Sequence, residues 1–247
     1  MADWAHPMLS VLLGYLVLGI TGFGSALIIV PLLAWKWPLP EAVALTMMLD
    51  LPAAALFGGL NFKQVQWVEA RRMLAGMLVG MAIGLWGVTV LDAMWPLLAL
   101  GLYVAVVGVR ALRAKPHAAA TPMSTTSPRW APVAGLLAGV VQLMFGAAGP
   151  VVLGWLERRV SDVRLLRATI PVVMMVAAAA ALALMATTGR LGHPELWQRW
   201  WVLIGVALVA VALGHRLSRH VPAAPLKRAI CALLVASGAM LMWRATR

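Results

Sequence analysis

The chain has 247 residues, of which 63% are hydrophobic and only 11% are charged. Soluble domains carry about 25% charged residues, so this composition excludes an ordinary soluble domain, and its long continuous apolar runs differ from the alternating pattern of membrane β-strands. The formal net charge is +12, but the basic residues lie between apolar runs, where loop charges facing lipid headgroups are expected. We therefore expect a lipid bilayer and no nucleic acid as a partner.

Eight apolar runs follow one another along the chain. They cover residues 8–37, 42–60, 73–91, 96–112, 131–156, 170–187, 197–213 and 230–243. A break rich in Pro, Ser and Thr separates the fourth run from the fifth, which is typical of a flexible linker. We therefore predict a first transmembrane repeat at 1–112, a linker at 113–130 and a second repeat at 131–247. No basic segment precedes the first run, so we expect that run to stay in the mature protein.

The two halves have a similar order of small residues and prolines. GITGFGSALIIVPLLAW begins at Gly19 and GVVQLMFGAAGPVVLGW begins at Gly139, and each ends at a Trp 16 residues after its first Gly. Gly76 in the first half matches Gly205 in the second half at an offset of 129. This order indicates an internal duplication, which is the usual architecture of secondary transporters. Chance similarity between apolar segments is the alternative.

The first run of each half is too long for one straight crossing. Residues 8–37 would form a helix of about 45 Å, whereas the hydrocarbon core of a bilayer is about 30 Å thick. Glycines interrupt the run, and two half-helices at 8–20 and 25–37 could enter and leave on the same side. Residues 131–156 allow the same re-entrant hairpin, with the bend at 145–149.

Charge counting separates the two topologies. If every run crosses, the 20 basic residues split eleven to nine between the faces. If runs one and five are re-entrant, one face keeps only five of them, and the other fifteen gather opposite, as the positive-inside rule expects. The five are Lys36, Arg190, Arg199, Arg244 and Arg247. We therefore favour an all-α integral membrane protein of the bacterial inner (plasma) membrane. Its two four-segment repeats would be inverted, each beginning with a broken, re-entrant hairpin, and both termini would lie outside.

The predicted bends would bring two glycine-rich segments together near the bilayer midplane. A helix that starts just after each bend points free N–H groups and the positive end of its dipole inward, which suits an anion. A serine hydroxyl and a glutamine amide could add donors. The candidate binding residues are Gly22, Phe23, Gly24, Ser25, Thr46, Gln142, Phe145, Gly146, Ala147, Ala148, Gly149 and Thr169. The alternative is that these glycines only allow tight helix packing.

Asp50 lies midway along an apolar run, where a carboxylate costs about 2.5–3.5 kcal/mol on insertion scales. It is a candidate for proton coupling or gating, or else a hydrogen-bonded carboxyl at the break near Pro52. Thr46 and Thr169 could each donate to a ligand, or bond back to their own helix. No nucleophile motif, metal-ligand spacing or paired-carboxylate pattern occurs. We expect no enzyme activity, no metal and no cofactor.

Five segments together resemble the sulfite exporter TauE/SafE family of membrane permeases. They are GITGFGSALIIVPLL from Gly19, VQWVEARRMLAGMLVGMAIG from Val65, FGAAGPVVLGWL from Phe145, GRLGHPELWQRWWVLIGVALV from Gly189 and LKRAICALLVASGAMLMW from Leu226. The resemblance covers nearly the whole chain. It implies a permease for a small sulfur-containing anion such as sulfite or an organosulfonate. A channel-like anion pore and a non-transport assembly factor are the alternatives, and a homodimer is left open.

Overall fold

The regular elements in the described part of the chain are all helices, as the sequence predicts. The computed structural model describes residues 2–22, 24–57, 62–92, 94–113, 127–160, 162–217 and 223–245. The first half holds α1 (Ala2–Thr21), α2 (Ser25–Leu33), α3 (Leu39–Phe57), the 3-10 turn η1 (Phe62–Gln64), α4 (Trp67–Val90) and α5 (Met94–Arg113). The second half holds the 3-10 turn η2 (Pro128–Trp130), α6 (Ala131–Phe145), α7 (Gly149–Arg159), α8 (Val163–Thr187), α9 (Pro194–Leu217) and α10 (Ala223–Ala245).

In the described part of the chain, five helices are long and apolar enough to cross a membrane. The segments are Trp4–Thr21, Trp67–Val90, Met94–Arg113, Arg164–Thr187 and Pro194–Leu217. Their outward faces carry exposed apolar side chains, such as Leu78 and Trp86 on α4, Leu102 on α5 and Val209 on α9. A helix that is apolar on its outer face as well as its inner face is typical of a lipid environment.

The helices extend beyond the predicted apolar runs. α1 begins at Ala2 and not at residue 8, and α4 begins at Trp67 and not at residue 73. Hydropathy marks the part of a helix that lies in lipid, whereas the first turns of α4 are polar and still helical. α2 is shorter than predicted, because a turn at residues 34–37 follows Leu33. Residues 114–126 of the predicted linker lie outside the described residues.

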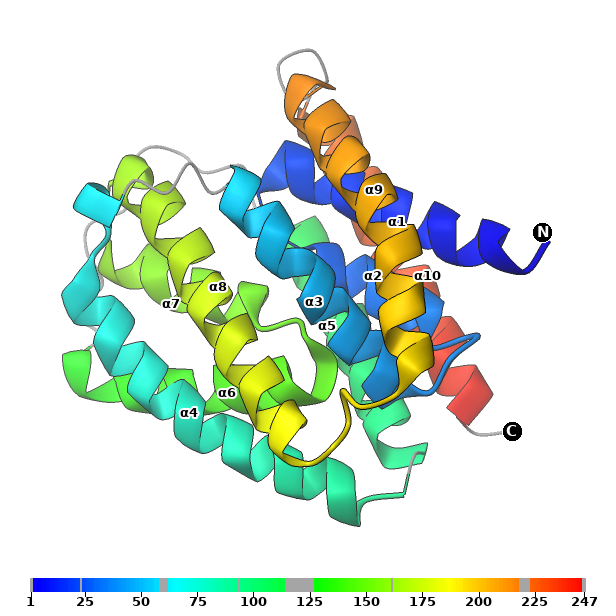
Figure 1. The fold of residues 1–247 in the computed structure, drawn as a ribbon. Helices are drawn as coiled ribbons and strands as arrows, with labels where there is room; N and C mark the ends of the chain where they lie inside the picture. The colour runs from blue at the N-terminus through cyan, green and yellow to red at the C-terminus, as the bar shows by residue number, and fades with distance from the viewer. Residues whose placement is uncertain are drawn as a thin grey trace.

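α4 and α6 come from different halves and pack closely through glycines. A Cβ added to Gly76 would collide with the backbone of Pro132, and one added to Gly80 would collide with that of Leu136. The contacting residue numbers rise together, so the two helices run in the same direction. Figure 1 places both on the side of the molecule that also holds α7 and α8.

α1 and α9 form the matching pair on the other side of the molecule (Figure 1). Gly19 lies against the backbone of Gly214, and Trp4 and Val202 line one surface hollow. These helices also run in the same direction. Each hairpin helix, α1 or α6, therefore packs along a helix of the opposite half.

α5 of the first half and α10 of the second half also pack against each other, but they run in opposite directions. Gly101 packs against Gly238, whereas Gly108 packs against Cys231 and its neighbours. The residue numbers on one helix rise as those on the other fall, so the two helices are antiparallel.

Among the residues that the structure describes, two ion-pair clusters connect the halves. In the first ion-pair cluster, Arg159 at the end of α7 donates to Glu69 Oε1 of α4 at 2.9 Å, and Arg72 lies 3.7 Å from the same oxygen. In the second ion-pair cluster, Arg199 of α9 pairs with Glu41 of α3. The first lies at the start of α8 and the second lies just beyond its end. α8 has 25 residues, or about 37 Å at 1.5 Å per residue.

Candidate functional site

The first helix break separates α1 from α2. Gly22 follows the last residue of α1, and Gly24 has a φ of +94°, a left-handed conformation that glycine adopts without steric cost. Ser25 then begins α2, and its N-cap residue Gly24 has no side chain that could cap the helix start. The first N–H groups of a helix have no partner within the helix, so the start of α2 keeps donors that a ligand can use.

Asp50 is held at this first break by two hydroxyl groups. Ser25 Oγ donates to Asp50 Oδ1 at 2.9 Å, and Tyr15 Oη donates to the same oxygen at 2.8 Å. Asp50 belongs to α3, so its single oxygen Oδ1 joins α3 to both α1 and α2. The coupling candidate and the binding candidate Ser25 are therefore direct neighbours, 25 residues apart in the sequence.

The second helix break separates α6 from α7 at residues 146–148. Gly146 has a φ of +67°, and the buried Gln142 accepts a hydrogen bond from the Ala148 N–H through its side-chain oxygen at 3.3 Å. Tyr103 of α5 donates to the Ala147 carbonyl at 2.7 Å, and its ring stacks on Phe145. No side chain caps the start of α7. Gln142 thus orders the backbone of the break.

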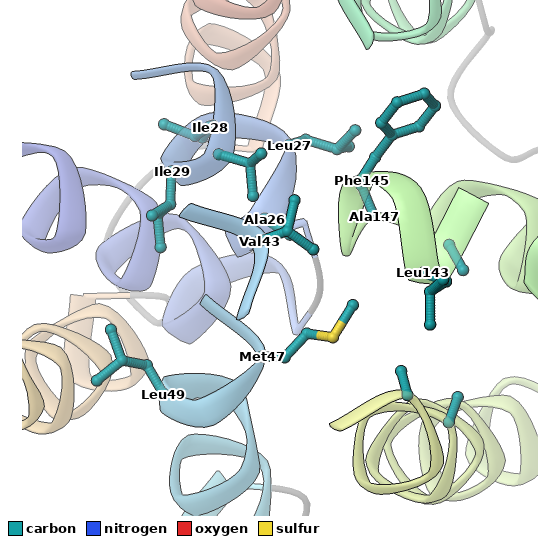
Figure 2. Close-up of a cluster of buried hydrophobic side chains, with 14 of the residues drawn as sticks. Ala26, Leu27, Ile28, Ile29, Val43, Met47, Leu49, Leu143, Phe145 and Ala147 are labelled. Carbon is teal, nitrogen blue, oxygen red and sulfur yellow. The ribbon is translucent and has the colours of Figure 1, made fainter. Parts of the chain in front are cut away.

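The two breaks meet in the centre of the molecule. A Cβ placed on Gly146 would lie 3.9 Å from Ala26 Cβ in the first turn of α2, and 3.7 and 3.8 Å from Val43 and Met47 of α3. Figure 2 shows Ala147 of the second break on the side that faces Ala26. The second break and the first turn of α2 therefore come together from opposite halves, beside apolar side chains of α3.

The glycines at the breaks differ from the glycines between helices. Gly149 is buried, yet a Cβ added to it would meet no described atom outside its own surroundings within 4 Å. Gly22 is exposed, and a Cβ there would also meet no described atom within 4 Å. In contrast, a Cβ on Gly135 or Gly139 of α6 would collide with the backbone of α4. Tight helix packing therefore explains Gly135 and Gly139 but does not explain Gly22 and Gly149.

The two candidate threonines bond back to their own helices. Thr46 Oγ1 donates to the Ala42 carbonyl and Thr169 Oγ1 donates to the Leu165 carbonyl, each at 2.7 Å. Thr169 also accepts from the Gln66 N–H at 3.0 Å. Both hydroxyl donors are thus occupied within the protein. Phe23 lies outside the described residues.

Tyr15 and Tyr103 are the site residues that sequence reasoning missed. They are the only two tyrosines of the chain, and each lies at one of the breaks. A usable signal was present, because a buried tyrosine hydroxyl in an apolar run needs a hydrogen-bond partner. The partners themselves lie 35 and 44 residues away.

Comparison with known proteins gives one family and one curated relative. The family model described as "Sulfite exporter TauE/SafE" matches residues 8–241. The chain is 45% identical over 204 residues to a protein of Comamonas testosteroni named "Probable inner membrane transporter protein TsaS", which covers 81% of this chain and 83% of that protein. No solved structure matches the chain.

Proposed function

Because the chain belongs to the sulfite exporter TauE/SafE family and is a multi-pass transporter of the inner membrane, we propose that it carries a small sulfur-containing anion. The family description names sulfite, and organosulfonates carry a chemically similar anionic group. The proposed binding site lies where the breaks at Gly22–Ser25 and Gly146–Gly149 meet.

The contact between the second break and the start of α2 carries this proposal. The starts of α2 and α7 have no side-chain cap and no acidic residue in the first turn. The start of α2 offers N–H groups and a positive dipole end to an anion. At the start of α7, Pro150 has no N–H, and the Val151 and Val152 N–H groups bond to the Ala148 carbonyl. The Gly149 N–H and the dipole end are therefore what α7 contributes. The open space beside Gly149 gives a ligand room to approach the backbone.

The ion-pair clusters support the re-entrant topology. If every apolar run crossed the bilayer, Arg72 and Arg159 would lie on opposite faces. Both instead contact Glu69, as they would if α1–α2 and α6–α7 each entered and left on one side. The antiparallel contact of α5 and α10 supports inverted repeats, because eight full crossings would make these two helices parallel.

We further propose that Asp50 couples proton binding to anion binding. An ionised Asp50 competes electrostatically with an anion for the start of α2, because it accepts a hydrogen bond from Ser25. A protonated Asp50 removes that repulsion. Export of a monoanion gains about 2.3 kcal/mol per 100 mV of inside-negative potential, so a coupling proton matters most for uptake.

Counterflow into proteoliposomes tests the transport proposal. The purified protein would be reconstituted alone and loaded with sulfite, thiosulfate, sulfate, sulfoacetate or taurine. Saturable exchange of labelled solute is expected for at least one sulfur-containing anion. Flux without saturation or counterflow indicates a channel-like pore. Absence of flux with every solute indicates a non-transport role such as assembly.

Two valine variants on one helix test the site. Gly149→Val places a branched side chain beside the proposed anion position, and we expect it to abolish binding. Gly154→Val is the matched control, since a Cβ at Gly154 also meets open space in α7 but lies away from the break. Equal solute affinity in the two variants would place the anion elsewhere.

A further inference from the structure

The first ion-pair cluster joins three helix ends at one end of the molecule. Glu69 lies in the first turn of α4, Arg159 is the last residue of α7, and the Gln66 N–H bonds to Thr169 of α8. A cavity of about 400 Å³ opens beside the pair, and Arg72 contributes to its lining. The cluster therefore connects α4 of the first half to α7 and α8 of the second.

The second ion-pair cluster joins the corresponding elements at the other end. Arg199 in the first turns of α9 pairs with Glu41 in the first turn of α3, and Glu195 accepts a second hydrogen bond at 2.7 Å. The Arg199 guanidinium lies 4.4 Å from the ring centroid of Trp37, which follows α2. This cluster connects α9 of the second half to α2 and α3 of the first half.

The two clusters thus occupy equivalent places in the duplicated halves. The first cluster links the first turns of α4 to the end of α7 and to the first turns of α8. The second cluster links the first turns of α9 to the turn after α2 and to the start of α3. The breaks meet between the two clusters. α7 runs from the second break to Arg159 in the first cluster, and the chain after α2 reaches Trp37 beside the second cluster.

The first cluster is suited to open as well as to close. Glu69 and Arg159 have only 10% and 16% of their side chains exposed, yet Glu69 Oε2 is buried without a hydrogen-bond partner in the described residues. Removing two charges from water has a large desolvation cost, which a partly satisfied pair offsets poorly. Such a pair holds the halves together with little net stability.

We propose that one ion pair in each cluster is a gate of the transporter. The Arg159–Glu69 pair closes the cytoplasmic side of the site between the breaks, and the Arg199–Glu41 pair closes its outer side. This inference rests on the proposed function. Both gates are closed in this structure. Rupture of one pair while the other persists opens the site to one side, which is what alternating access requires.

Thiol labelling from each face tests the gates. Ala147→Cys in a Cys231→Ala background puts a single reporter at the second break, and a membrane-impermeant thiol reagent is applied to intact cells or to inverted vesicles. Arg159→Gln is expected to raise labelling about tenfold from the cytoplasmic face only, which corresponds to about 1.4 kcal/mol. Glu41→Gln is expected to raise it from the outer face only.

Each gate has a control variant at an exposed residue that contacts one member of the gating pair. Arg72 contacts Glu69 but is 48% exposed, and Glu195 contacts Arg199 but is 76% exposed. Arg72→Gln and Glu195→Gln are therefore expected to leave labelling unchanged. Glu69→Gln is a second variant of the first pair. It removes the carboxylate itself, whereas Arg159→Gln leaves the Glu69 carboxylate without its Arg159 partner.

The outcomes distinguish this inference from the transport proposal. Labelling is measured without solute, so it does not depend on which anion is carried. Unchanged labelling in folded Arg159→Gln and Glu69→Gln proteins, or a rise from the same face for Arg159→Gln and Glu41→Gln, would overturn the gates. Failure of counterflow in the unmodified protein would overturn the proposed function and leave the labelling result standing.

Discussion

The hydroxyl group of Tyr103 lies 2.7 Å from the carbonyl oxygen of Ala147, which joins α5 of the first half to the helix break of the second half. Tyr15 stands in a comparable relation to the first break through Asp50. The two bonds differ in kind, because one fixes a backbone carbonyl and the other fixes a carboxyl group. The second break is therefore held by neutral groups, and the first by a group that can change its charge.

Tyr103→Phe tests the neutral bond. The phenyl ring keeps the stack on Phe145, but the Ala147 carbonyl loses its donor, which costs about 1–3 kcal/mol for a buried group. We expect a lower melting temperature in detergent and weaker solute binding. An unchanged melting temperature together with unchanged binding would show that the bond does not hold the break.

Asp50→Asn tests proton coupling. In the unmodified protein, thiosulfate affinity should rise as the pH falls, because protonation of Asp50 removes a negative charge beside Ser25. The carboxamide keeps the shape and stays neutral, so the variant should bind with equal affinity across the pH range. Thiosulfate is the probe because its own charge is constant near neutral pH. If the variant retained the pH dependence, another group would carry the proton.

Gly139→Ala and Gly205→Ala test how the helix glycines are used. A Cβ on Gly139 would collide with the backbone of Met77, whereas one on Gly205 would meet no described atom outside its own helix within 4 Å. Overpacking costs about 1–3 kcal/mol, while removal of a freely placed glycine stabilises by about 0.4–1 kcal/mol. Thermal unfolding should therefore shift in opposite directions. A parallel shift would contradict the packing assigned to α4 and α6.

Cysteine labelling at Ser127 and Thr188 tests the topology. In the re-entrant arrangement Ser127 lies on the cytoplasmic side and Thr188 lies outside. Eight full crossings would place both on one face. Each cysteine is introduced singly in the Cys231→Ala background and labelled from either side. Reaction of both positions from the same face would falsify the inverted-repeat proposal.

The positions of the helix breaks could be predicted from the sequence, because glycine marks a backbone that leaves the right-handed helical region. Gly24 and Gly146 have positive φ where the two bends were expected. The helix ends were less predictable, since polar first turns such as that at Glu69 look like loop in a hydropathy pattern. The match between Gly76 and Gly205 does not extend to their contacts, because of the two only Gly76 packs closely on another described helix.

The contacts that hold the candidate site could not be predicted. Asp50 finds Ser25 and Tyr15 only because α3 lies beside both α1 and α2, and Arg159 reaches Glu69 across 90 residues. Such pairs depend on how the two halves interlock. A single sequence shows that a membrane-embedded acid needs partners, but it does not show which hydroxyl groups supply them.

The exchange of partners between the halves also governs how the chain assembles during synthesis. α1 enters the membrane first, but the helix that covers it, α9, begins at Pro194. The first hairpin therefore lies in the bilayer without its packing partner α9 until most of the second half has been synthesised. α4 in turn presents an uncovered row of glycines until α6 arrives beyond the linker. Neither half can complete its packing alone, because α1 and α4 find their partners only after α9 and α6 have been made.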